Sequence, residues 1–239
     1  RSAARRCTPP RQLPARQMTT TLKTVVFMGS SRSLVPPWGG ESRLGSRVLQ
    51  YVTKTLAARN APVGKSESKV VHDVTVFDPL EVFGEGGALA QSGCQLSEPH
   101  FFFKPGSAPA AMDAMRDAIK AADAIVIVTA EYNHAPPPAL LSMLDHFGGS
   151  CYAGKPSGIV TYSNGPWGGT RCAVVIQPVL HELGCLPVSK MVHLPAPQEL
   201  LSEDGGAVDD THRMLKQLPG MLDQLEWMAV AMKAQRDAT

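Results

Sequence analysis

Short apolar runs alternate along this chain with longer segments that carry one apolar face, and this alternation restricts the possible folds more than any other feature. The run at 124–128 is entirely apolar, and the runs at 24–28 and 158–162 are almost as apolar. Strands of this composition are buried on both faces, which is typical of parallel sheets covered by helices on both sides. The sequence therefore predicts an α/β fold. Strands are expected at 24–28, 70–77, 124–128, 157–162 and 186–193, and helices at 44–59, 110–121, 138–147, 169–184 and 209–236.

Few topologies are compatible with this alternation, because crossover connections between parallel strands are right-handed. Five strands with intervening helices fit a doubly wound parallel sheet of order 2-1-3-4-5, with its switch point between strands one and three. Open sheets of this kind bind ligands at the carboxyl ends of their strands. The segments after the first, third and fourth strands, at 29–32, 131–133 and 163–169, are therefore expected to form one site.

Size and charge narrow the class of protein. The chain has 239 residues, of which 44% are hydrophobic and 18% charged, and this composition suits one globular domain. We expect that domain at 22–239, with a helical segment at its C-terminal end. The net charge of +2 is too small to favour a nucleic acid as partner, and no apolar run has the length of a membrane span.

Residues 1–21 are expected to be a disordered leader outside this domain. Arginine recurs in this segment, prolines oppose a helix, and no acidic residue precedes Glu41. An Arg-rich, acid-poor leader is compatible with an organelle transit peptide, but Met18 begins a stretch that resembles an ordinary start of translation. We therefore expect a cytoplasmic protein, with an organelle as the alternative.

The cysteines and histidines do not indicate a disulfide framework or a metal site. The five cysteines are odd in number, and no two of them form a C-x-x-C pair. The seven histidines lack the spacing that would place two ligands on one helix face. Reduced thiols and no metal are expected.

Three segments are expected to be irregular. Residues 81–108 carry several glycines and prolines and should form a long surface loop, with the aromatic residues 101–103 tucked under the domain. Residues 33–40 should form an inserted loop before the first helix. Pro219 and Gly220 should kink or split the last helix.

The segment Gly29-Ser30-Ser31-Arg32 carries the groups that bind a phosphate. Glycine permits a tight turn, and the hydroxyls, backbone N–H groups and guanidinium are donors near a helix N-terminus, which attracts anions. Neither G-x-x-x-x-G-K-[ST] nor G-x-G-x-x-G is present, so a monophosphate is the remaining candidate. The alternative is a purely structural turn. Arg43 is interpreted either as a second phosphate ligand or as a solvated surface residue.

The segment Glu131-Tyr132-Asn133 directly follows the most apolar strand. Tyrosine and asparagine at such a strand end indicate a planar ligand that lies near the ring while loop amides bind its polar edge. Glu131 either contacts this ligand or forms a helix cap or loop salt bridge. Asp145 is interpreted as a helix-end or interface residue, with catalysis as the less favoured alternative, and a proton-transfer role for His134 is also less favoured.

The loop at 163–169 has little side-chain bulk. Gly165, Gly168 and Gly169 would let backbone amides approach a flat ring closely, because glycine has no Cβ and adopts positive φ. Ser163 begins this loop and Trp167 is a candidate wall of the pocket.

Several motifs taken together carry a family resemblance, and they are Gly29-Ser30-x-Arg32, Arg43-Leu44-Gly45-x-Arg47-Val48, Ala130-Glu131-Tyr132-Asn133 with Leu140 and Asp145, Lys155-Pro156, and Tyr162-Ser163 to Gly168-Gly169. They resemble the motifs of the NADPH-dependent FMN reductases of the flavodoxin superfamily, a family that includes quinone, chromate and azo-dye reductases. The resemblance spans residues 22–195.

This resemblance implies a flavodoxin-like fold, an FMN cofactor and a homodimer or homotetramer. Ser30 and Arg32 would hold the FMN phosphate. The isoalloxazine would lie between Glu131, Tyr132 and Asn133 on one side and Ser163, Gly165, Gly168 and Gly169 on the other. The chain departs from the family pattern at Ala130, where proline is usual, at Leu141-Ser142, where Lys-Asn is usual, and in the insert at 33–40.

The function expected on these grounds is that of an FMN-dependent NAD(P)H oxidoreductase. Hydride from NADPH or NADH would pass through flavin N5 to a quinone, free flavin or similar small-molecule acceptor, with ping-pong kinetics and no catalytic side chain. The alternative is a flavin-binding redox sensor or interaction module with little turnover. A flavodoxin-type electron carrier is less favoured, because it would need an acidic docking surface that a chain of net charge +2 does not offer.

Overall fold

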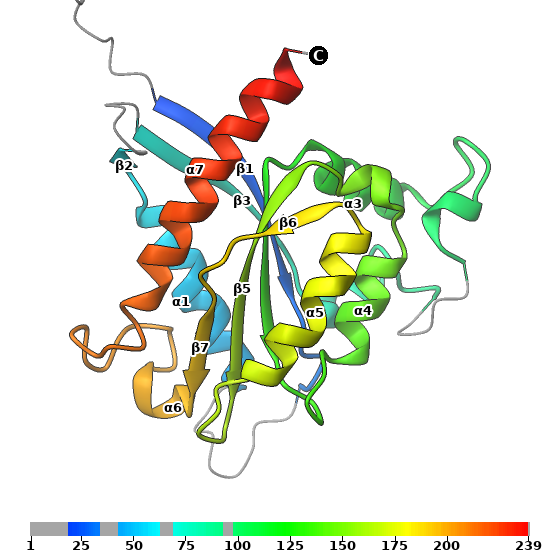
Figure 1. The fold of residues 1–239 in the computed structure, drawn as a ribbon. Helices are drawn as coiled ribbons and strands as arrows, with labels where there is room; N and C mark the ends of the chain where they lie inside the picture. The colour runs from blue at the N-terminus through cyan, green and yellow to red at the C-terminus, as the bar shows by residue number, and fades with distance from the viewer. Residues whose placement is uncertain (1–18, 34–42, 63–68, 93–97, 239) are drawn as a thin grey trace, which may run out of the picture.

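The computed structural model describes residues 19–33, 43–62, 69–92 and 98–238. Within these segments, one sheet is covered by helices on both faces (Figure 1). The strands are β1 (Thr19–Met28), β2 (Ala61–Pro62), β3 (Lys69–Phe77), β4 (Ala124–Ala130), β5 (Lys155–Ser163), β6 (Cys185–Pro187) and β7 (Val192–Pro195). The helices are α1 (Leu44–Ala58), α2 (Pro79–Val82), α3 (Ala110–Ala121), α4 (Pro138–Asp145), α5 (Thr170–Glu182), α6 (Pro197–Leu200) and α7 (Gln217–Asp237), with 3-10 turns η1 (His100–Phe102) and η2 (Gly149–Cys151).

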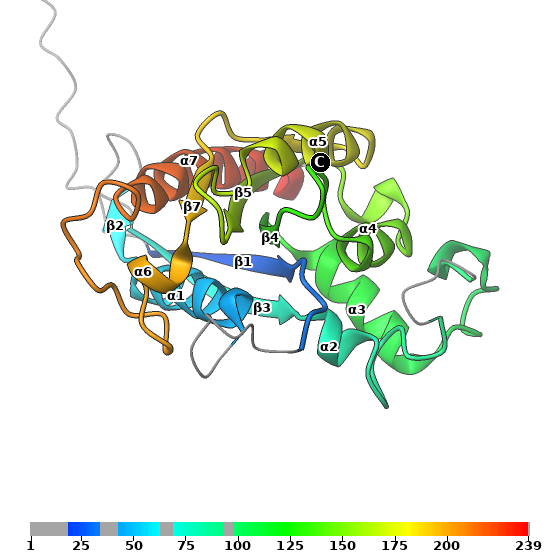
Figure 2. The same cartoon turned by 90° about the horizontal axis from the view of Figure 1, so that it is seen from below.

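The order of the parallel strands confirms the predicted topology. β1 lies between β3 and β4, β5 follows β4, and all of these pairs are parallel (Figure 2). The two residues of β2 pair antiparallel with the outer edge of β3. The predicted order 2-1-3-4-5 thus corresponds to β3-β1-β4-β5 followed by β6 and β7.

The fifth predicted strand, at 186–193, is in fact two short strands. β6 pairs with the first residues of β5, and β7 pairs with its last residues. Pro187 ends β6, and because proline has no N–H it cannot continue the ladder as a donor. The chain leaves the sheet there and pairs with β5 again at Val192.

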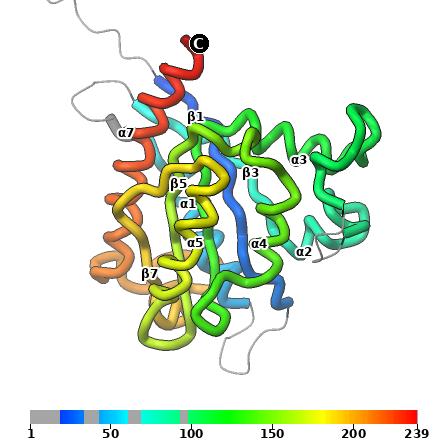
Figure 3. The backbone as a smooth tube through the Cα atoms, turned by 45° about the vertical axis from the view of Figure 1, so that its right-hand side comes forward, coloured from blue at the N-terminus to red at the C-terminus, as the bar shows by residue number. Residues whose placement is uncertain are grey.

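The two faces of the sheet belong to two separate cores. Val26 and Val126 lie in the core beneath α1 and α7, whereas Phe27 and Ile127 lie in the core beneath α3, α4 and α5. Figure 3 shows α4 and α5 next to each other on the second face. Every residue of β4 is buried, which explains why the sequence there has no alternation of polar and apolar side chains.

The start of β1 corrects the predicted extent of the leader. Thr19, Thr20 and Thr21 belong to β1 and pair with the first residues of β3. The predicted boundary at residue 21 was wrong for these three positions, because the pairing partner that extends the strand is distant in sequence. The rest of the predicted leader, residues 1–18, lies outside the described residues, as do residues 34–40 of the predicted insert.

The long segment at 81–108 is less irregular than expected. α2 and η1 lie in or overlap it, and residues 93–97 are outside the described part. Phe101 and Phe102 are 56% and 74% exposed, so the prediction that they are tucked under the domain was wrong. Only Phe103 of this trio packs against the core beneath α3. The two exposed rings contact each other edge to face, with centroids 5.2 Å apart.

The C-terminal helix starts later than expected and is not split. α7 begins at Gln217, and residues 209–216 form bends and turns. Pro219 is therefore in the first turn of the helix, where an N–H has no intrahelical acceptor to lose, and the predicted kink was wrong. Neither α7 nor any other helix of the described segments is long and apolar enough to cross a bilayer.

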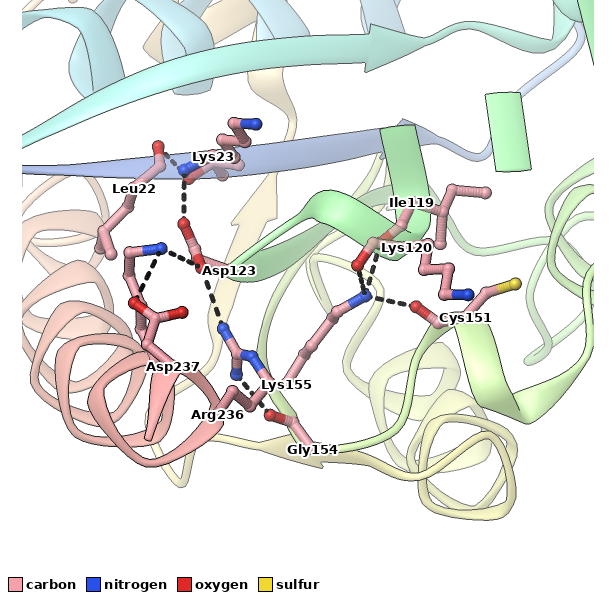
Figure 4. A network of polar contacts seen from close by, with 12 residues as sticks. Leu22, Lys23, Ile119, Lys120, Asp123, Cys151, Gly154, Lys155, Arg236 and Asp237 are labelled. Carbon is pink, nitrogen blue, oxygen red and sulfur yellow. Dashed lines mark hydrogen bonds and ion pairs between the residues drawn. The ribbon is translucent and has the colours of Figure 1, made fainter. Parts of the chain in front are cut away.

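The amino ends of the central strands are joined to α7 through a buried carboxylate. Asp123, which precedes β4, accepts a hydrogen bond at 3.0 Å from the backbone N–H of Lys23 in β1. Its other oxygen is 2.9 Å from a guanidinium nitrogen of Arg236 and 3.3 Å from the ammonium of Lys233 (Figure 4). This cluster attaches the end of α7 to the sheet at the edge opposite to the carboxyl ends of the strands.

A buried lysine at the same edge of the sheet donates hydrogen bonds to three backbone carbonyls. The side chain of Lys155, at the start of β5, is 3% exposed, and its ammonium donates to the backbone carbonyls of Ile119 (2.6 Å), Lys120 (2.9 Å) and Cys151 (Figure 4). Two of these carbonyls end α3, where helix carbonyls lack intrahelical partners. Burial lowers the pKa of Lys155 from 10.5 to about 8.

Replacing Lys155 tests this attachment. Lys155→Met should lower the free energy of unfolding by about 2–4 kcal/mol at pH 7, because buried carbonyls lose their donor. The control Lys120→Met, at an exposed lysine of the same region, should change it by less than about 0.5 kcal/mol. Urea unfolding monitored by circular dichroism measures both, and equal stability of the two variants would contradict the assigned role.

The pH dependence of the same comparison has a defined sign. Between pH 8 and 10.5 the unfolded chain binds a proton at Lys155 that the folded chain has released. The wild type should therefore gain stability relative to Lys155→Met as the pH rises through this window. A difference that is constant or that shrinks over the window would show that burial does not lower this pKa.

Candidate functional site at the carboxyl edge of the sheet

The loop after β1 turns so closely against β4 that only glycine fits at its first position. The N–H of Gly29 donates to the carbonyl of Val128 at 2.8 Å. A Cβ at Gly29 would come within 2.2 Å of the Thr129 hydroxyl oxygen. The absence of a side chain thus lets the chain leave β1 directly over the end of β4.

The two predicted phosphate ligands of this loop both contact Tyr132. Ser30 is buried, and its hydroxyl oxygen lies 2.7 Å from the Tyr132 hydroxyl. The exposed side chain of Arg32 places its guanidinium carbon 4.0 Å from the centre of the Tyr132 ring. The N–H of Arg32 also donates to the Ser30 hydroxyl oxygen at 3.3 Å. The loops after β1 and β4 are therefore joined through one tyrosine.

Arg43 lies beside the same loop but is bonded to the protein on three sides. Its guanidinium donates to the Ser30 carbonyl at 3.0 Å, to the Ser46 hydroxyl at 2.8 Å and to the carboxylate of Asp78. Asp78 in turn accepts from the N–H of Leu80 at the start of α2. Arg43 is thus a brace between the loop, α1 and the end of β3, and not the solvated surface residue of the alternative interpretation. A direct contact with phosphate stays a prediction.

The segment after β4 forms a tight reverse turn. The N–H of Tyr132 donates to the Ala135 carbonyl at 2.9 Å, and the N–H of Ala135 donates back at 3.0 Å. Between them, Asn133 and His134 have φ values of 49° and 66°. Two consecutive positive φ values are typical of a type I′ turn, and asparagine and histidine tolerate them better than most residues. This turn directs the Tyr132 side chain back toward β1.

Glu131 caps α5, which was one of its two interpretations from the sequence. One carboxylate oxygen accepts from the N–H groups of Arg171 and Cys172, at 3.0 and 3.1 Å, in the first turn of α5. The other oxygen is 3.6 Å from the Arg171 guanidinium. A carboxylate in this position satisfies helix amides and interacts favourably with the helix dipole. Glu131 therefore fixes the start of α5 relative to β4.

Gly168 and Gly169 connect β5 to α5 with positive φ values of 58° and 81°. A Cβ at Gly168 would meet the backbone of His193 at 2.9 Å, and one at Gly169 would meet Thr161 at 2.8 Å. The Thr161 hydroxyl donates to the Gly168 carbonyl at 2.8 Å. Both glycines are thus needed for the loop after β5 to pack closely against β5 and β7.

The outer part of this loop is open. Gly165 is exposed, and a Cβ there would contact nothing within 4 Å. Ser163 donates to the Gly165 carbonyl at 3.1 Å. Trp167 is 62% exposed, with the Arg171 guanidinium carbon 5.1 Å from its ring centre. Arg171 could not be singled out from the sequence, because its partners Glu131 and Trp167 come near it only in the folded chain.

Tyr162 was not selected as a site residue from the sequence, because it lies within an ordinary apolar strand. Tyr162, in β5, is 4% exposed, and its hydroxyl has no hydrogen-bond partner of acceptable geometry among the described residues. A Cβ at Gly45, in the first turn of α1, would lie 2.4 Å from this hydroxyl. Burial raises the pKa of Tyr162 above its ordinary value of 10. The hydroxyl is therefore a neutral polar group beside the start of α1.

Other predicted candidates are accounted for by the fold. Asp145 is the last residue of α4, as expected of a helix-end residue. Cys151, Cys172 and Cys185 are buried free thiols. Burial raises the pKa of Cys172 to about 12, which disfavours the reactive thiolate at the start of α5. Cys7 and Cys94 lie outside the described residues.

Solved structures with a similar fold define the class. FerB from Paracoccus denitrificans, described as a flavoenzyme NAD(P)H:(acceptor) oxidoreductase, has a TM-score of 0.59 at 17% identity, covering 86% of this chain and 97% of its own. An oxidoreductase from Corynebacterium diphtheriae has a TM-score of 0.57 at 13% identity, covering 90% and 99% of the two chains. With the strand order described above, this likeness defines a flavodoxin-like fold.

The family follows from the sequence match. The family model of the NADPH-dependent FMN reductases matches residues 22–198. The chain belongs to this family, which confirms the resemblance inferred from its motifs.

Curated relatives match over shorter segments. A protein named quinone reductase from Escherichia coli (strain K12) is 36% identical over 85 residues, which are 34% of this chain and 45% of the relative. A protein named quinone reductase from Pseudomonas putida is 31% identical over 114 residues, which are 45% of this chain and 61% of the relative. The matched segments thus span about half of the length of these two relatives.

The capping role of Glu131 can be measured directly. Glu131→Ala should lower the free energy of unfolding by about 1–2 kcal/mol, because two amides at the start of α5 lose their acceptor. Glu131→Gln keeps an acceptor oxygen and should lose less. Glu182→Ala, at the last residue of α5, removes a carboxylate near the negative end of the helix dipole and should not destabilise the protein. Urea unfolding that ranks Glu131→Ala equal to the Glu182 control would refute the cap.

Proposed function

We propose that this chain binds FMN at the carboxyl edge of the sheet and uses NADPH or NADH to reduce a small-molecule acceptor through it. The observation that carries the proposal is the contact set Ser30–Tyr132–Arg32, which brings a hydroxyl and a guanidinium together where the loops after β1 and β4 meet. Family membership over residues 22–198 supports the same cofactor.

The donor set of the first loop fits a phosphate monoester. A phosphate oxygen accepts hydrogen bonds, and the Ser30 hydroxyl, the Arg32 guanidinium and the N–H groups that begin α1 are all donors. Arg43 is the N-cap residue of α1, and within the described residues its side chain makes no capping hydrogen bond to this helix end. Gly45 lets the start of α1 pack closely against β1, since a Cβ there would meet Met28 at 2.1 Å. The residues present therefore fit the phosphate end of FMN.

The other two loops fit a flat ring. Asn133 lies at an exposed turn after β4, and Ser163 and Gly165 open the loop after β5. These positions would line the isoalloxazine, whereas Glu131, Gly168 and Gly169 would act by fixing the shape of the two loops. Trp167 and Arg171 would form the outer wall. Bound FMN would supply the hydride chemistry, while the chain holds the ring and provides amide donors at its edge.

The acceptor is proposed to be a quinone, free flavin or another small oxidant, as the names of the curated relatives suggest. Because donor and acceptor would use the same face of the ring in turn, we expect ping-pong kinetics. We also propose that the protein is a homodimer or homotetramer, which the exposed apolar residues of α5 support. Val174 and Val175 of α5 are 60% and 44% exposed.

Flavin absorbance tests the proposal and separates it from a sensor with little turnover. Purified protein reconstituted with FMN should lose the visible absorbance band of oxidised flavin, at about 450 nm, when it is mixed anaerobically with NADPH. A quinone added afterwards should restore the colour. Flavin that binds but is not bleached would support the sensor, and protein that binds no flavin would contradict both functions.

The contribution of Arg32 can be isolated. Arg32→Ala should weaken FMN binding by about 1.5–3 kcal/mol if the guanidinium donates to the phosphate. Arg116→Ala, which removes a partly exposed arginine of α3 that is paired with Asp113 and Asp117, is the control and should leave the affinity unchanged. Titration by quenching of flavin fluorescence measures both, and unaltered affinity of Arg32→Ala would exclude Arg32 from the site.

A further inference from the structure

Tyr132 contacts both predicted phosphate ligands with different parts of its side chain. Its hydroxyl is 2.7 Å from the Ser30 hydroxyl oxygen, and its ring lies 4.0 Å from the Arg32 guanidinium carbon. The turn at Asn133 and His134 holds the side chain in this direction. The sequence assigned Tyr132 to the isoalloxazine, and that assignment stays a prediction; the contacts with Ser30 and Arg32 put its side chain beside both predicted phosphate ligands.

The hydroxyl contact determines where the Ser30 proton can point. A serine hydroxyl has one proton to donate and two acceptor positions. The N–H of Arg32 already donates to the Ser30 oxygen at 3.3 Å. Either hydroxyl of this 2.7 Å pair could be the donor, and we assign the donor role to Tyr132 because a phenol is a stronger acid than an aliphatic alcohol. Both acceptor positions are then filled, so the Ser30 proton can point only to an acceptor, which is either the neighbouring Tyr162 hydroxyl or a bound ligand.

A fully ionised phosphate is such a ligand. It carries no proton to offer to Ser30, so it requires the serine to donate. Without the Tyr132 hydroxyl, the Ser30 proton is free to turn to other acceptors nearby. The second contact, between the ring and Arg32, keeps the guanidinium beside Ser30, where a charge and a hydroxyl act on the same group.

We propose that Tyr132 is the positioning residue of the phosphate site, with its hydroxyl directing the Ser30 proton and its ring holding Arg32, so that the protein selects phosphorylated flavin over riboflavin. The inference rests on the proposed function, since it concerns the same site. It assigns the specificity for the monophosphate to a residue that does not itself need to touch the phosphate.

Two substitutions separate the two parts of the side chain. Tyr132→Phe removes the hydroxyl and keeps the ring, and it should weaken FMN binding about fivefold, which is the usual contribution of one hydrogen bond. Tyr132→Leu also removes the ring and should weaken binding about threefold further, in line with an exposed cation–π contact. The affinity for riboflavin, which has no phosphate, should stay unchanged in both variants.

A third variant tests whether Tyr132 acts through Ser30. In a Ser30→Ala background, Tyr132→Phe should cause no further loss of FMN affinity, because there is no proton left to direct. Tyr51→Phe is the matched control, since it deletes a tyrosine hydroxyl that donates to the Leu215 carbonyl at 2.8 Å from α1. It should leave both flavin affinities unchanged. Thermal unfolding of each variant shows that the fold is retained.

The outcomes are distinct. A wild type that binds no FMN would contradict the proposed function itself. A wild type that binds FMN while Tyr132→Phe binds it equally well would overturn the role of the hydroxyl. Equal weakening of FMN and riboflavin would place Tyr132 at the ring, and an undiminished loss in the Ser30→Ala background would show that it acts independently of Ser30.

Discussion

The parallel pairing of β1 with β3 and β4 is the constraint on which the rest of this structure depends. Parallel strands all end at the same edge of a sheet, so the loops after β1, β4 and β5 lie next to one another. Burial on both faces fixes the register, because each alternate residue belongs to a different core. The site is thus a consequence of sheet topology, and the side chains at the strand ends decide what it binds.

Polar groups at the amino edge and at the carboxyl edge of the sheet make different kinds of contact. At the amino edge, Asp123 and Lys155 bond helix ends and strand starts into a closed network, with donors and acceptors of the protein matched to one another. At the carboxyl edge, Arg43 and Glu131 do the same for the loops, whereas Ser30 and Arg32 contact Tyr132 and form no ion pair with another described residue. Such positioned donors are what an acceptor-rich ligand requires.

Much of this architecture could be predicted from the sequence, because burial on both faces leaves uninterrupted apolar runs. The strand order and the three converging loops followed from that pattern. The partners of Arg43 and Glu131 did not, since Asp78 and the start of α5 come near only after the chain has folded. Tyr162 was missed because its hydroxyl stands in an apolar strand. The split of the fifth strand at Pro187 was not predicted. The exposure of Phe101 and Phe102 was not predicted either, because loop composition does not show where a loop will lie.

A structure of the protein with FMN bound would locate both ends of the cofactor. We expect the phosphate within hydrogen-bond distance of the Ser30 hydroxyl and the Arg32 guanidinium, at the start of α1, with the ring between the turn at Asn133 and the loop that contains Gly165. A phosphate bound elsewhere, or a ring that lies away from the carboxyl ends of β1, β4 and β5, would contradict this expectation.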